Sequence, residues 1–205
     1  STGYVYVADT GNDRIQIFTP HGIFSSSFGS LGTGNGQFNG TAGIAINSTG
    51  YVYVADTGND RIQIFNRDGS YSTSFGSAGS GNDQFTTPMG IAIDSSGFIY
   101  VADTGNDRTT KRTPSGSFIE SLPGTFDGPT GVSVFDADNI YTVDTGNDKI
   151  KKHDTGTRAK TESLPLTATV STTVTKSISL IESLPLTDTV STNAVLSISL
   201  IESLP

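Results

Sequence analysis

A five-residue phrase, Asp-Thr-Gly-Asn-Asp, occurs four times in this chain. The copies begin at Asp9, Asp56, Asp103 and Asp144, so successive copies are 47, 47 and 41 residues apart. The surrounding sequence repeats too, since residues 1–13 are identical to residues 48–60. A period of about 40 to 50 residues is typical of chains in which each repeat is one small folded unit. We therefore expect several similar units that pack on one another.

Each unit contains four short segments with the pattern of β-strands. In the second unit they read GIAIN, YVYVAD, RIQIF and SYSTSFG, with Ser, Thr, Asn, Asp and Gly between them. Period-two alternation and β-branched or aromatic residues predict strands, and Asp-Gly pairs predict tight hairpins. A repeated four-stranded antiparallel unit of this length predicts an all-β fold, the β-propeller. One small sheet cannot cover both of its faces, so neighbouring blades must cover each other.

The segment QFTTPMGIAIDSSGFIYVADTGNDR, at residues 84–108, resembles the NHL repeat. That resemblance covers about 150 residues and implies a propeller, which in this family usually has six blades. We expect an incomplete, open ring of about four blades from a longer protein, because the first unit begins at its second strand. The expected divisions are a partial blade at 1–29, full blades at 30–76 and 77–123, an irregular blade at 124–158, and a Ser/Thr-rich tail at 159–205.

The repeated phrase has the residues of a tight turn between the second and third strands. Asp and Asn side chains accept hydrogen bonds from nearby backbone N–H groups, and Gly58 is expected to take a positive φ. Arg61 is expected to bridge carboxylates of neighbouring turns. The turn residues are Asp9, Gly11, Asn12 and Arg14; Asp56, Gly58, Asn59 and Arg61; Asp103, Gly105, Asn106 and Arg108; Asp144, Gly146, Asn147 and Lys149. A calcium loop is disfavoured, because it is longer and ends in a bidentate Glu.

The sequence predicts no catalytic residue, no metal site and no cofactor, and it does not identify the binding residues. The chain has no Cys, and His21 and His153 occupy non-equivalent places in their repeats. The resemblance implies an alternative, since NHL-like lyases and lactonases hold a metal with side chains of the first strands. Here those strands offer only Asn47 and Asp94. We expect a non-enzymatic binding module, with a metal-dependent lyase or lactonase as the alternative.

Charge and short motifs bear on partners and location. The net charge is −8, with 12 basic and 20 acidic residues, which disfavours nucleic acid as a partner. No apolar run is long enough to span a membrane. Asn39 and Asn47 each begin an N-glycosylation motif. We expect an extracellular or cell-surface protein whose propeller loops bind a protein or a glycan. A structural spacer in a cell envelope is a further alternative.

Two regions depart from the regular pattern. The third strand of the third unit reads RTTKR where the second unit has RIQIF, so we expect that strand at a solvent-exposed edge. The tail repeats a 20-residue unit at residues 162–181 and 182–201, each beginning with ESLP. Such Ser/Thr-rich repeats resemble those of bacterial and archaeal surface proteins. The letters ESLP also occur at Glu120–Pro123, inside the third unit.

Overall fold

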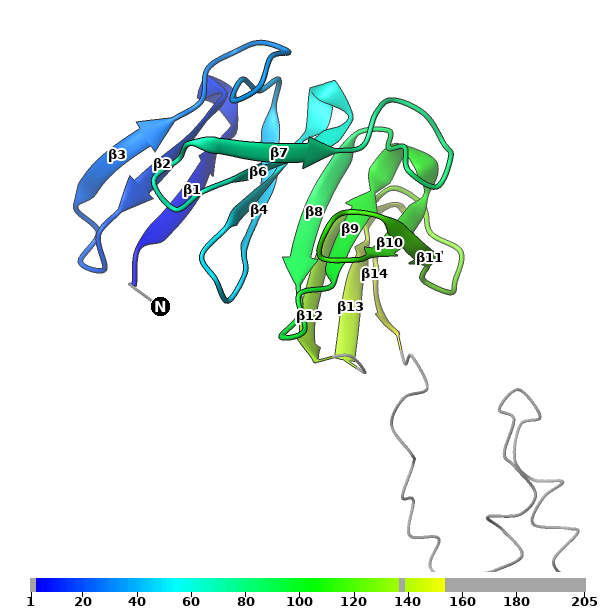
Figure 1. The fold of residues 1–205 in the computed structure, drawn as a ribbon. Helices are drawn as coiled ribbons and strands as arrows, with labels where there is room; N and C mark the ends of the chain where they lie inside the picture. Colours follow the sequence, from blue (N-terminus) through cyan, green and yellow to red (C-terminus); the bar gives the residue numbers. More distant parts are fainter. Residues whose placement is uncertain (1–2, 137–138, 154–205) are drawn as a thin grey trace, which may run out of the picture. The chain divides into compact units, whose positions relative to one another are not determined.

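A computed structural model describes residues 3–136 and 139–153, which contain fourteen strands in four antiparallel sheets (Figure 1). The tail repeats lie outside these residues. The first blade has β1 (Val5–Asp9), β2 (Arg14–Phe18) and β3 (Phe24–Phe28). The second has β4 (Thr41–Ile46), β5 (Val52–Asp56), β6 (Arg61–Phe65) and β7 (Tyr71–Phe75). The third has β8 (Pro88–Ile93), β9 (Ile99–Asp103), β10 (Arg108–Arg112) and β11 (Phe118–Ser121), and the fourth has β12 (Pro129–Asp136), β13 (Asn139–Asp144) and β14 (Lys149–His153).

Each sheet is a simple meander in which strands that follow one another in the chain are hydrogen-bonded neighbours. Figure 1 shows the sheets succeeding one another in chain order, from β1–β3 in blue to β12–β14 in yellow-green. The first strand of each blade contacts the first strand of the next, β4 beside β8 and β8 beside β12. The expected all-β propeller of about four blades is therefore confirmed. No helix among the described residues is long and apolar enough to cross a membrane.

The hydrophobic core lies between the blades. One cluster joins the first and second blades through Ile15, Phe38 and Val54. A second joins the second and third blades and includes Ile62 and Phe85, and a third joins the third and fourth blades. Each cluster forms because period-two strands place apolar side chains on both faces of a sheet, and only a neighbouring sheet removes them from water.

Glycine allows the first strands to approach closely. A Cβ atom on Gly90 of β8 would lie 2.8 Å from the Cα atom of Gly131 in β12. A Cβ on Gly43 of β4 would lie 2.3 Å from the carbonyl oxygen of Met89. No side chain fits at such distances, so Gly43 and Gly90 are needed for the contact of each blade with the next.

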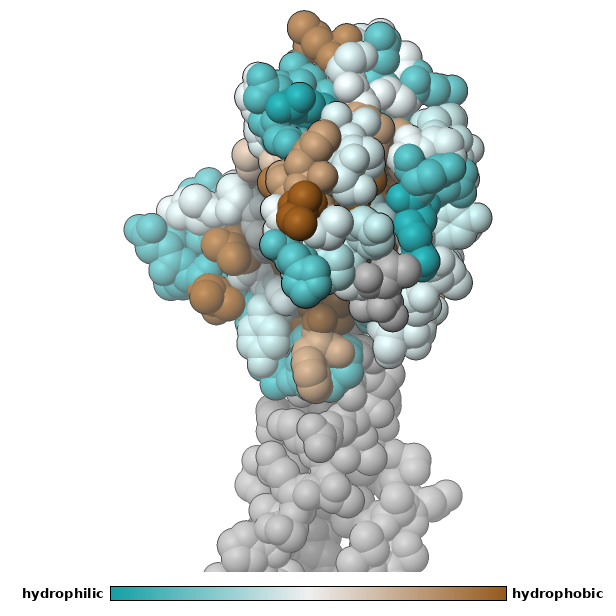
Figure 2. Space-filling model, turned by 90° about the vertical axis from the view of Figure 1, so that its left-hand side faces the viewer, coloured by the Kyte–Doolittle hydropathy of each residue, from teal (hydrophilic) through white to brown (hydrophobic). Residues whose placement is uncertain are grey.

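The two end blades expose apolar positions that are buried in the middle of the array. Val5 of β1 is 49% exposed, whereas Val52, at the same place in the second blade, is fully buried. On the fourth blade, Ile150 of β14 is 71% exposed, whereas its counterpart Ile62 is fully buried. Figure 2, which faces the left-hand side of Figure 1, shows apolar patches separated by polar surface. The described blades thus form an open array.

The expectation of an exposed third strand in the third blade is wrong. β10 lies between β9 and β11, and its residues Thr109, Thr110 and Arg112 are buried. The Arg112 guanidinium lies 4.2 Å from the Phe85 ring centroid and donates to the carbonyl oxygens of Gly116 and Asn82. Aromatic rings and backbone carbonyls therefore hold the cation, which sequence polarity alone places in solvent.

Candidate functional site

The repeated phrase forms the same turn four times. In the second blade, Asp56 ends β5, η2 (Thr57–Asn59) forms one short 3-10 turn, and Asp60 adopts the left-handed conformation with φ of 53°. The other turns are η1 (Thr10–Asn12), η3 (Thr104–Asn106) and η4 (Thr145–Asn147). The prediction that Gly58 takes a positive φ is wrong, because the following Asp does so, and Asp tolerates that region.

Gly58 is required for a different reason. A Cβ atom there would lie 2.7 Å from the carbonyl oxygen of Asn39, in the segment that leads into β4. The backbone N–H of Gly58 donates to the same oxygen, at 2.8 Å. The turn and the incoming chain are therefore in direct backbone contact, which leaves no room for a side chain.

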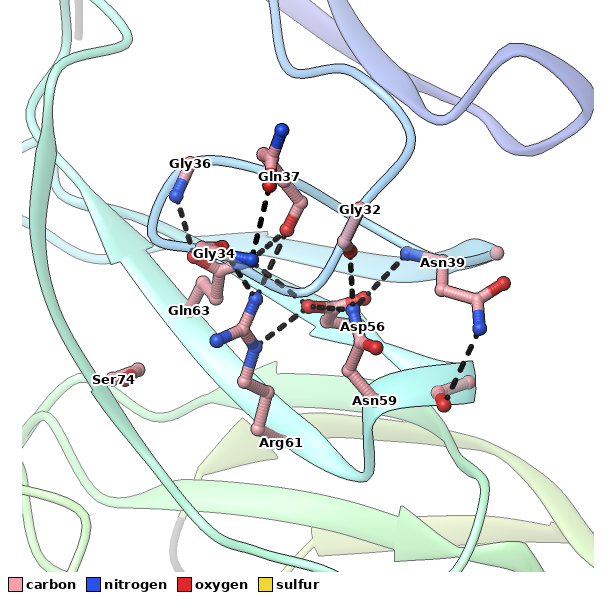
Figure 3. Close-up of polar contacts among 12 residues, drawn as sticks. Gly32, Gly34, Gly36, Gln37, Asn39, Asp56, Asn59, Arg61, Gln63 and Ser74 are labelled. Carbon is pink, nitrogen blue, oxygen red and sulfur yellow. Dashed lines mark hydrogen bonds and ion pairs between the residues drawn. The ribbon is translucent and has the colours of Figure 1, made fainter.

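The Asp56 carboxylate is the centre of the turn's hydrogen bonds (Figure 3). It is buried, and it accepts hydrogen bonds from the Arg61 Nε at 2.8 Å, the Gln63 side chain at 2.9 Å and the Asn59 side chain at 2.9 Å. The backbone N–H of Asn39 also donates to it, at 2.8 Å. A buried carboxylate with this many donors has its desolvation compensated.

The donors around Asp56 also hold the loop that connects the first and second blades. Arg61 donates to the carbonyl oxygens of Gly34 and Gln37, at 2.7 and 3.1 Å. Asn59 donates to Gly32 O at 2.9 Å, as Figure 3 shows. The expectation that Arg61 bridges carboxylates of neighbouring turns is wrong: its ion pair is with Asp56 of its own turn, and its other donors bind loop backbone.

Gln63, two residues after Arg61 on the same strand, completes the hold on this loop. Its side chain donates to Gln37 O at 2.6 Å and accepts from the backbone N–H of Gly36 at 3.0 Å. Sequence analysis did not select Gln63. The signal was present, because Gln16 and Gln63 repeat at the same distance from the phrase.

The same turn also contacts the next blade. The Thr57 hydroxyl donates to Pro88 O at 2.8 Å, and the Asp60 carboxylate accepts from the backbone N–H of Thr87 at 2.7 Å. The residues of one phrase thus fasten both the chain entering their own blade and the chain entering the following blade. We call this set of contacts the latch.

The third blade reproduces the latch with different loop residues. Asp103 accepts from Arg108, Asn106 and the backbone N–H of Thr86. Arg108 donates in turn to the carbonyl oxygens of Ser80, Gly81 and Gln84. Gly105 stands where Gly58 does, and a Cβ there would lie 2.6 Å from the Thr86 side chain.

The first blade carries half of the latch. Asn12, Arg14 and Gln16 all donate to Asp9, and the hydrogen bond from Arg14 holds the pKa of Asp9 below its ordinary value. The structure thus places Asn12 and Arg14 around one carboxylate, whereas Gly11 lies in the 3-10 turn between them and Asp9. Asp13 fastens the next blade by accepting from Gly40 N–H at 2.6 Å.

The fourth blade uses a lysine that the sequence did not point to. Lys149 stands in the place of Arg61, directly after the turn and opposite Asp144, and its side chain is exposed. Lys151, in the place of Gln63, forms the ion pair with Asp144 at 2.7 Å and also donates to Thr125 O. The hydrogen bond from Lys151 to the Asp144 carboxylate lowers the pKa of Asp144. Asn147 donates to the same carboxylate, and Gly146 lies against Asp127.

The two residues offered for catalysis belong to hairpins. Asn47 Oδ1 accepts from the backbone N–H groups of Thr49 and Tyr51. Asp94 accepts from Phe98 N–H and from the Tyr100 hydroxyl at 3.1 Å. Both side chains therefore close the turn between the first and second strands of their blades. Of the two glycosylation candidates, Asn39 is exposed and Asn47 half-buried.

The two histidines differ in solvent exposure. His21 is exposed in the β2–β3 hairpin, whereas His153 is buried in the place of Phe65. The His153 ring lies 5.6 Å from the Phe126 ring and its Nε2 is 3.1 Å from the Thr142 hydroxyl. Burial lowers the pKa of His153. In the described part of the chain, no three His, Cys, Asp or Glu side chains are grouped as metal ligands.

The latches create a surface, which we call the loop face. It consists of the connecting segments 30–40 and 77–87 together with the four 3-10 turns, all at the same end of the blades. Leu31 is 68% exposed on this face. Arg61 and Gln63 form hydrogen bonds to the backbone of segment 30–40. The exposed side chains of this segment are therefore carried by an ordered backbone.

Comparisons with known proteins agree with this architecture. The pattern of the family DUF5128, described as a six-bladed β-propeller, matches residues 47–120. A comparison with curated proteins found no match. The fold is similar to that of streptogramin B lyase, with a TM-score of 0.53 and 18% identity over 75% of this chain and 52% of that chain.

Other solved structures share the fold. The WD40 repeats of RRP9 match with a TM-score of 0.55 and 13% identity, over 73% of this chain and 47% of that one. Virginiamycin B lyase from Staphylococcus aureus matches with a TM-score of 0.50 and 16% identity, over 74% and 52%. The chain spans about half the length of these structures. At such identities the likeness shows the β-propeller fold alone.

Proposed function

We propose that this chain is a non-enzymatic binding module of the NHL type, which recognises a protein or a glycan through its loop face. The observation that carries the proposal is the fastening of the connecting loops. Backbone groups between Gly32 and Asn39 are bound by Asp56, Asn59, Arg61 and Gln63. A loop that is already ordered loses little conformational entropy on binding.

Some outward positions of the two loops differ, although Ser30 and Asn35 are repeated as Ser77 and Asn82. Exposed Leu31 and Thr33 of the first loop correspond to Ala78 and Ser80 of the second. By contrast, the core residue Phe38 corresponds to Phe85. A common frame that carries different side chains at some outward positions suits a recognition surface.

Charge and location complete the proposal. A net charge of −8 favours a neutral or basic ligand surface over nucleic acid. We place the protein outside the cell or on its surface, because a glycosylation motif begins at exposed Asn39 on the loop face.

The test compares two exposed apolar residues at opposite ends of the first blade. Leu31→Asp alters the loop face, whereas Ile23→Asp alters the β2–β3 hairpin at the other end, where Ile23 is 66% exposed. A printed glycan array and cross-linking to a surface-protein extract supply candidate ligands, which are then purified for titration. We expect Leu31→Asp to weaken binding about tenfold or more while Ile23→Asp binds normally. Loss of binding in Ile23→Asp alone would overturn the assignment of the loop face.

The enzymatic alternative has its own readout. In a lyase- or lactonase-like propeller, a metal ion would be retained by the purified protein. We expect elemental analysis to find substoichiometric metal, and a stoichiometric ion lost on mutation of Asp94 would replace our proposal. A pure envelope spacer would bind neither glycans nor proteins in the array and cross-linking experiments.

A further inference from the structure

The connecting segment 30–40 of the loop face carries two Asn-Gly pairs, Asn35-Gly36 and Asn39-Gly40. Both Asn residues are exposed. Asn is a chemically labile residue, and it deamidates most readily before Gly, because Gly has no Cβ atom to keep its backbone nitrogen away from the Asn side chain. The loop face therefore contains two candidate sites of a spontaneous covalent modification.

Deamidation is an intramolecular substitution that needs only water. The backbone nitrogen of the Gly bonds to the side-chain carbonyl carbon of the Asn, and the side-chain amide leaves as ammonia, which takes the proton of the Gly N–H. Water then opens the resulting succinimide ring and leaves Asp or its β-linked isomer, isoaspartate. The product carries a new negative charge. The first step requires that the Gly nitrogen is free to approach the carbonyl carbon in the geometry of attack.

The latch engages the reactive nitrogen of the first pair. The backbone N–H of Gly36 donates to the Gln63 Oε1 at 3.0 Å, and Gln63 is fully buried. Gln63 is itself fixed, since its Nε2 donates to Gln37 O at 2.6 Å and to the Asp56 carboxylate at 2.9 Å. The backbone N–H of Gln37 donates to Gly34 O at 3.2 Å, which closes a turn around the pair.

The latch of the preceding blade engages the second pair. The backbone N–H of Gly40 donates to the Asp13 carboxylate at 2.6 Å. The backbone of Asn39 is fixed as well, because its N–H donates to Asp56 at 2.8 Å and its carbonyl oxygen accepts from Gly58 at 2.8 Å. Carboxylates are far too weak as bases to remove the proton of a backbone amide, so Asp13 holds this nitrogen without activating it.

We propose that Asn35 and Asn39 are deamidation sites of the loop face and that the latch controls them. Asn35 converts only when Gln63 releases the N–H of the following Gly. Asn39 converts only when Asp13 releases the corresponding N–H. The hydrogen bond to Asp13 is the shorter of the two and is assisted by charge, so Asn35 converts first. A latch that opens thus leaves a permanent negative charge on the loop face, whichever ligand this face binds.

The first test compares the folded and the unfolded chain. The full-length protein, from a host without N-glycosylation, is kept at mildly alkaline pH in isotopically labelled water, with and without urea, and peptide mapping by mass spectrometry measures conversion. Asn82 is the internal standard, because Asp83 stands in the place of Gly36 and its side chain hinders the attack. We expect Asn35 and Asn39 to convert about tenfold or more slowly in the folded chain, with Asn35 ahead. Equal rates in both states would overturn the proposal.

The second test removes one hydrogen bond at a time. Gln63→Lys offers no acceptor to the Gly36 N–H but keeps a donor for Asp56, as Lys151 does in the fourth blade. We expect it to speed up conversion of Asn35 about tenfold or more while Asn39 keeps its natural rate. Unchanged conversion of Asn35 would contradict the control assigned to Gln63.

The crossed variant is Asp13→Ala, which removes the acceptor of the second pair. It should speed up Asn39 about tenfold or more and leave Asn35 at its natural rate. Asp13→Asn is the matched control, because it keeps an acceptor oxygen and Asn tolerates the left-handed conformation of this position, so both sites should stay slow. Equal acceleration of both sites in Asp13→Ala and in Gln63→Lys would overturn the proposal, since global unfolding would then control the reaction.

Discussion

At the scale of single residues, the buried carboxylate of each latch is the group on which the repeat depends. Asp56→Asn removes the charge but keeps the shape, leaving the Arg61 guanidinium, whose side chain is 14% exposed, without its counter-ion. We expect a loss of about 2 to 4 kcal/mol in the free energy of unfolding, measured by urea titration, because breaking one side of a buried pair leaves an uncompensated charge.

The first blade supplies the control for that substitution. Asp9 and Arg14 form the same pair, but the Arg14 side chain is 41% exposed. Water can therefore replace the lost partner, and Asp9→Asn should cost distinctly less than Asp56→Asn. Equal losses at the two positions would mean that burial does not set the strength of the latch.

The buried His153 should make the stability of the protein depend on pH. Burial beside Phe126 and Thr142 is the main cause that lowers the pKa of His153. The positive charge of Lys151 lowers it further. The unfolded chain takes up a proton near the ordinary value of 6.5, whereas the folded chain resists it, so stability is full above that pH and declines as the pH falls towards the lower folded pKa. His153→Phe, which installs the residue of the second blade, should flatten this decline.

The measurement is the urea midpoint at pH 7.5 and at pH 5.0. Linkage of one proton limits the effect to about 1.4 kcal/mol per pH unit. The exposed His21 in the hairpin supplies the control, and His21→Asn should leave the pH dependence as in the natural chain. A His153→Phe protein with unchanged pH dependence would refute the role assigned to the buried imidazole.

Residue roles were predictable from the sequence only where a contact is local. The carboxylate, the Asn and the Arg of the phrase are close in the chain, and the structure brings them together. The carbonyl partners of Arg61 lie 24 and 27 residues away, and no local pattern identifies them. In the fourth blade, only the fold shows that Lys151 rather than Lys149 reaches Asp144.

At the scale of elements, the connecting loop and the 3-10 turn are fitted by backbone contact. Gly58 and Gly11 occupy the same place in identical turns, but only Gly58 lies against an incoming segment. Gly58→Ala should therefore lower the free energy of unfolding by about 1 to 3 kcal/mol through overpacking. Gly11→Ala meets no atom within 4 Å and should change it by less than about 0.5 kcal/mol.

Thermal or urea denaturation of the two Ala variants decides this point. Because the turns are identical in sequence, helix propensity affects both alike, and the difference isolates the contact with Asn39. Similar effects would show that Gly is kept for the turn itself rather than for the approach of the loop.

Strands were predictable as elements because alternation and burial agree in most of them. RIQIF at β6 is buried and was recognised from its pattern. RTTKR at β10 is buried as well, yet its composition predicts exposure. The desolvation of the buried Arg112 guanidinium is compensated by residues outside this strand. The guanidinium lies on the Phe85 ring and donates to two loop carbonyl oxygens. The sequence of the strand alone does not reveal such partners.

At the scale of the whole molecule, the apolar ends of the array should govern association. Ile150 is 71% exposed on the fourth blade, at a position that neighbouring blades bury. We expect the chain to self-associate with increasing concentration in sedimentation velocity experiments, and Ile150→Lys to shift the association to about tenfold higher concentration. Ile23→Lys, at an exposed hairpin position, should leave it unchanged. A natural chain that stays monomeric at all concentrations would contradict this expectation.

The number and order of blades were predictable because the period of the phrase counts them directly. The way in which they join was not, since it depends on the close approach of Gly90 to Gly131 and on latches between segments far apart in the chain. Function at this scale is a proposal that rests on the held loops.

The identity of residues 1–18 and 48–65 has a consequence for how the chain reaches its native arrangement. Because the two stretches have the same sequence, each can form the same two strands and turn. They therefore compete for the same neighbouring strands during synthesis. Only the sequence around them distinguishes the native pairing from the exchanged one. A chain that exchanges the two stretches would form a regular blade at the wrong position and would have to unfold it again. This protein should therefore refold more slowly than its short hairpins suggest. A few conservative substitutions in one copy should speed up refolding.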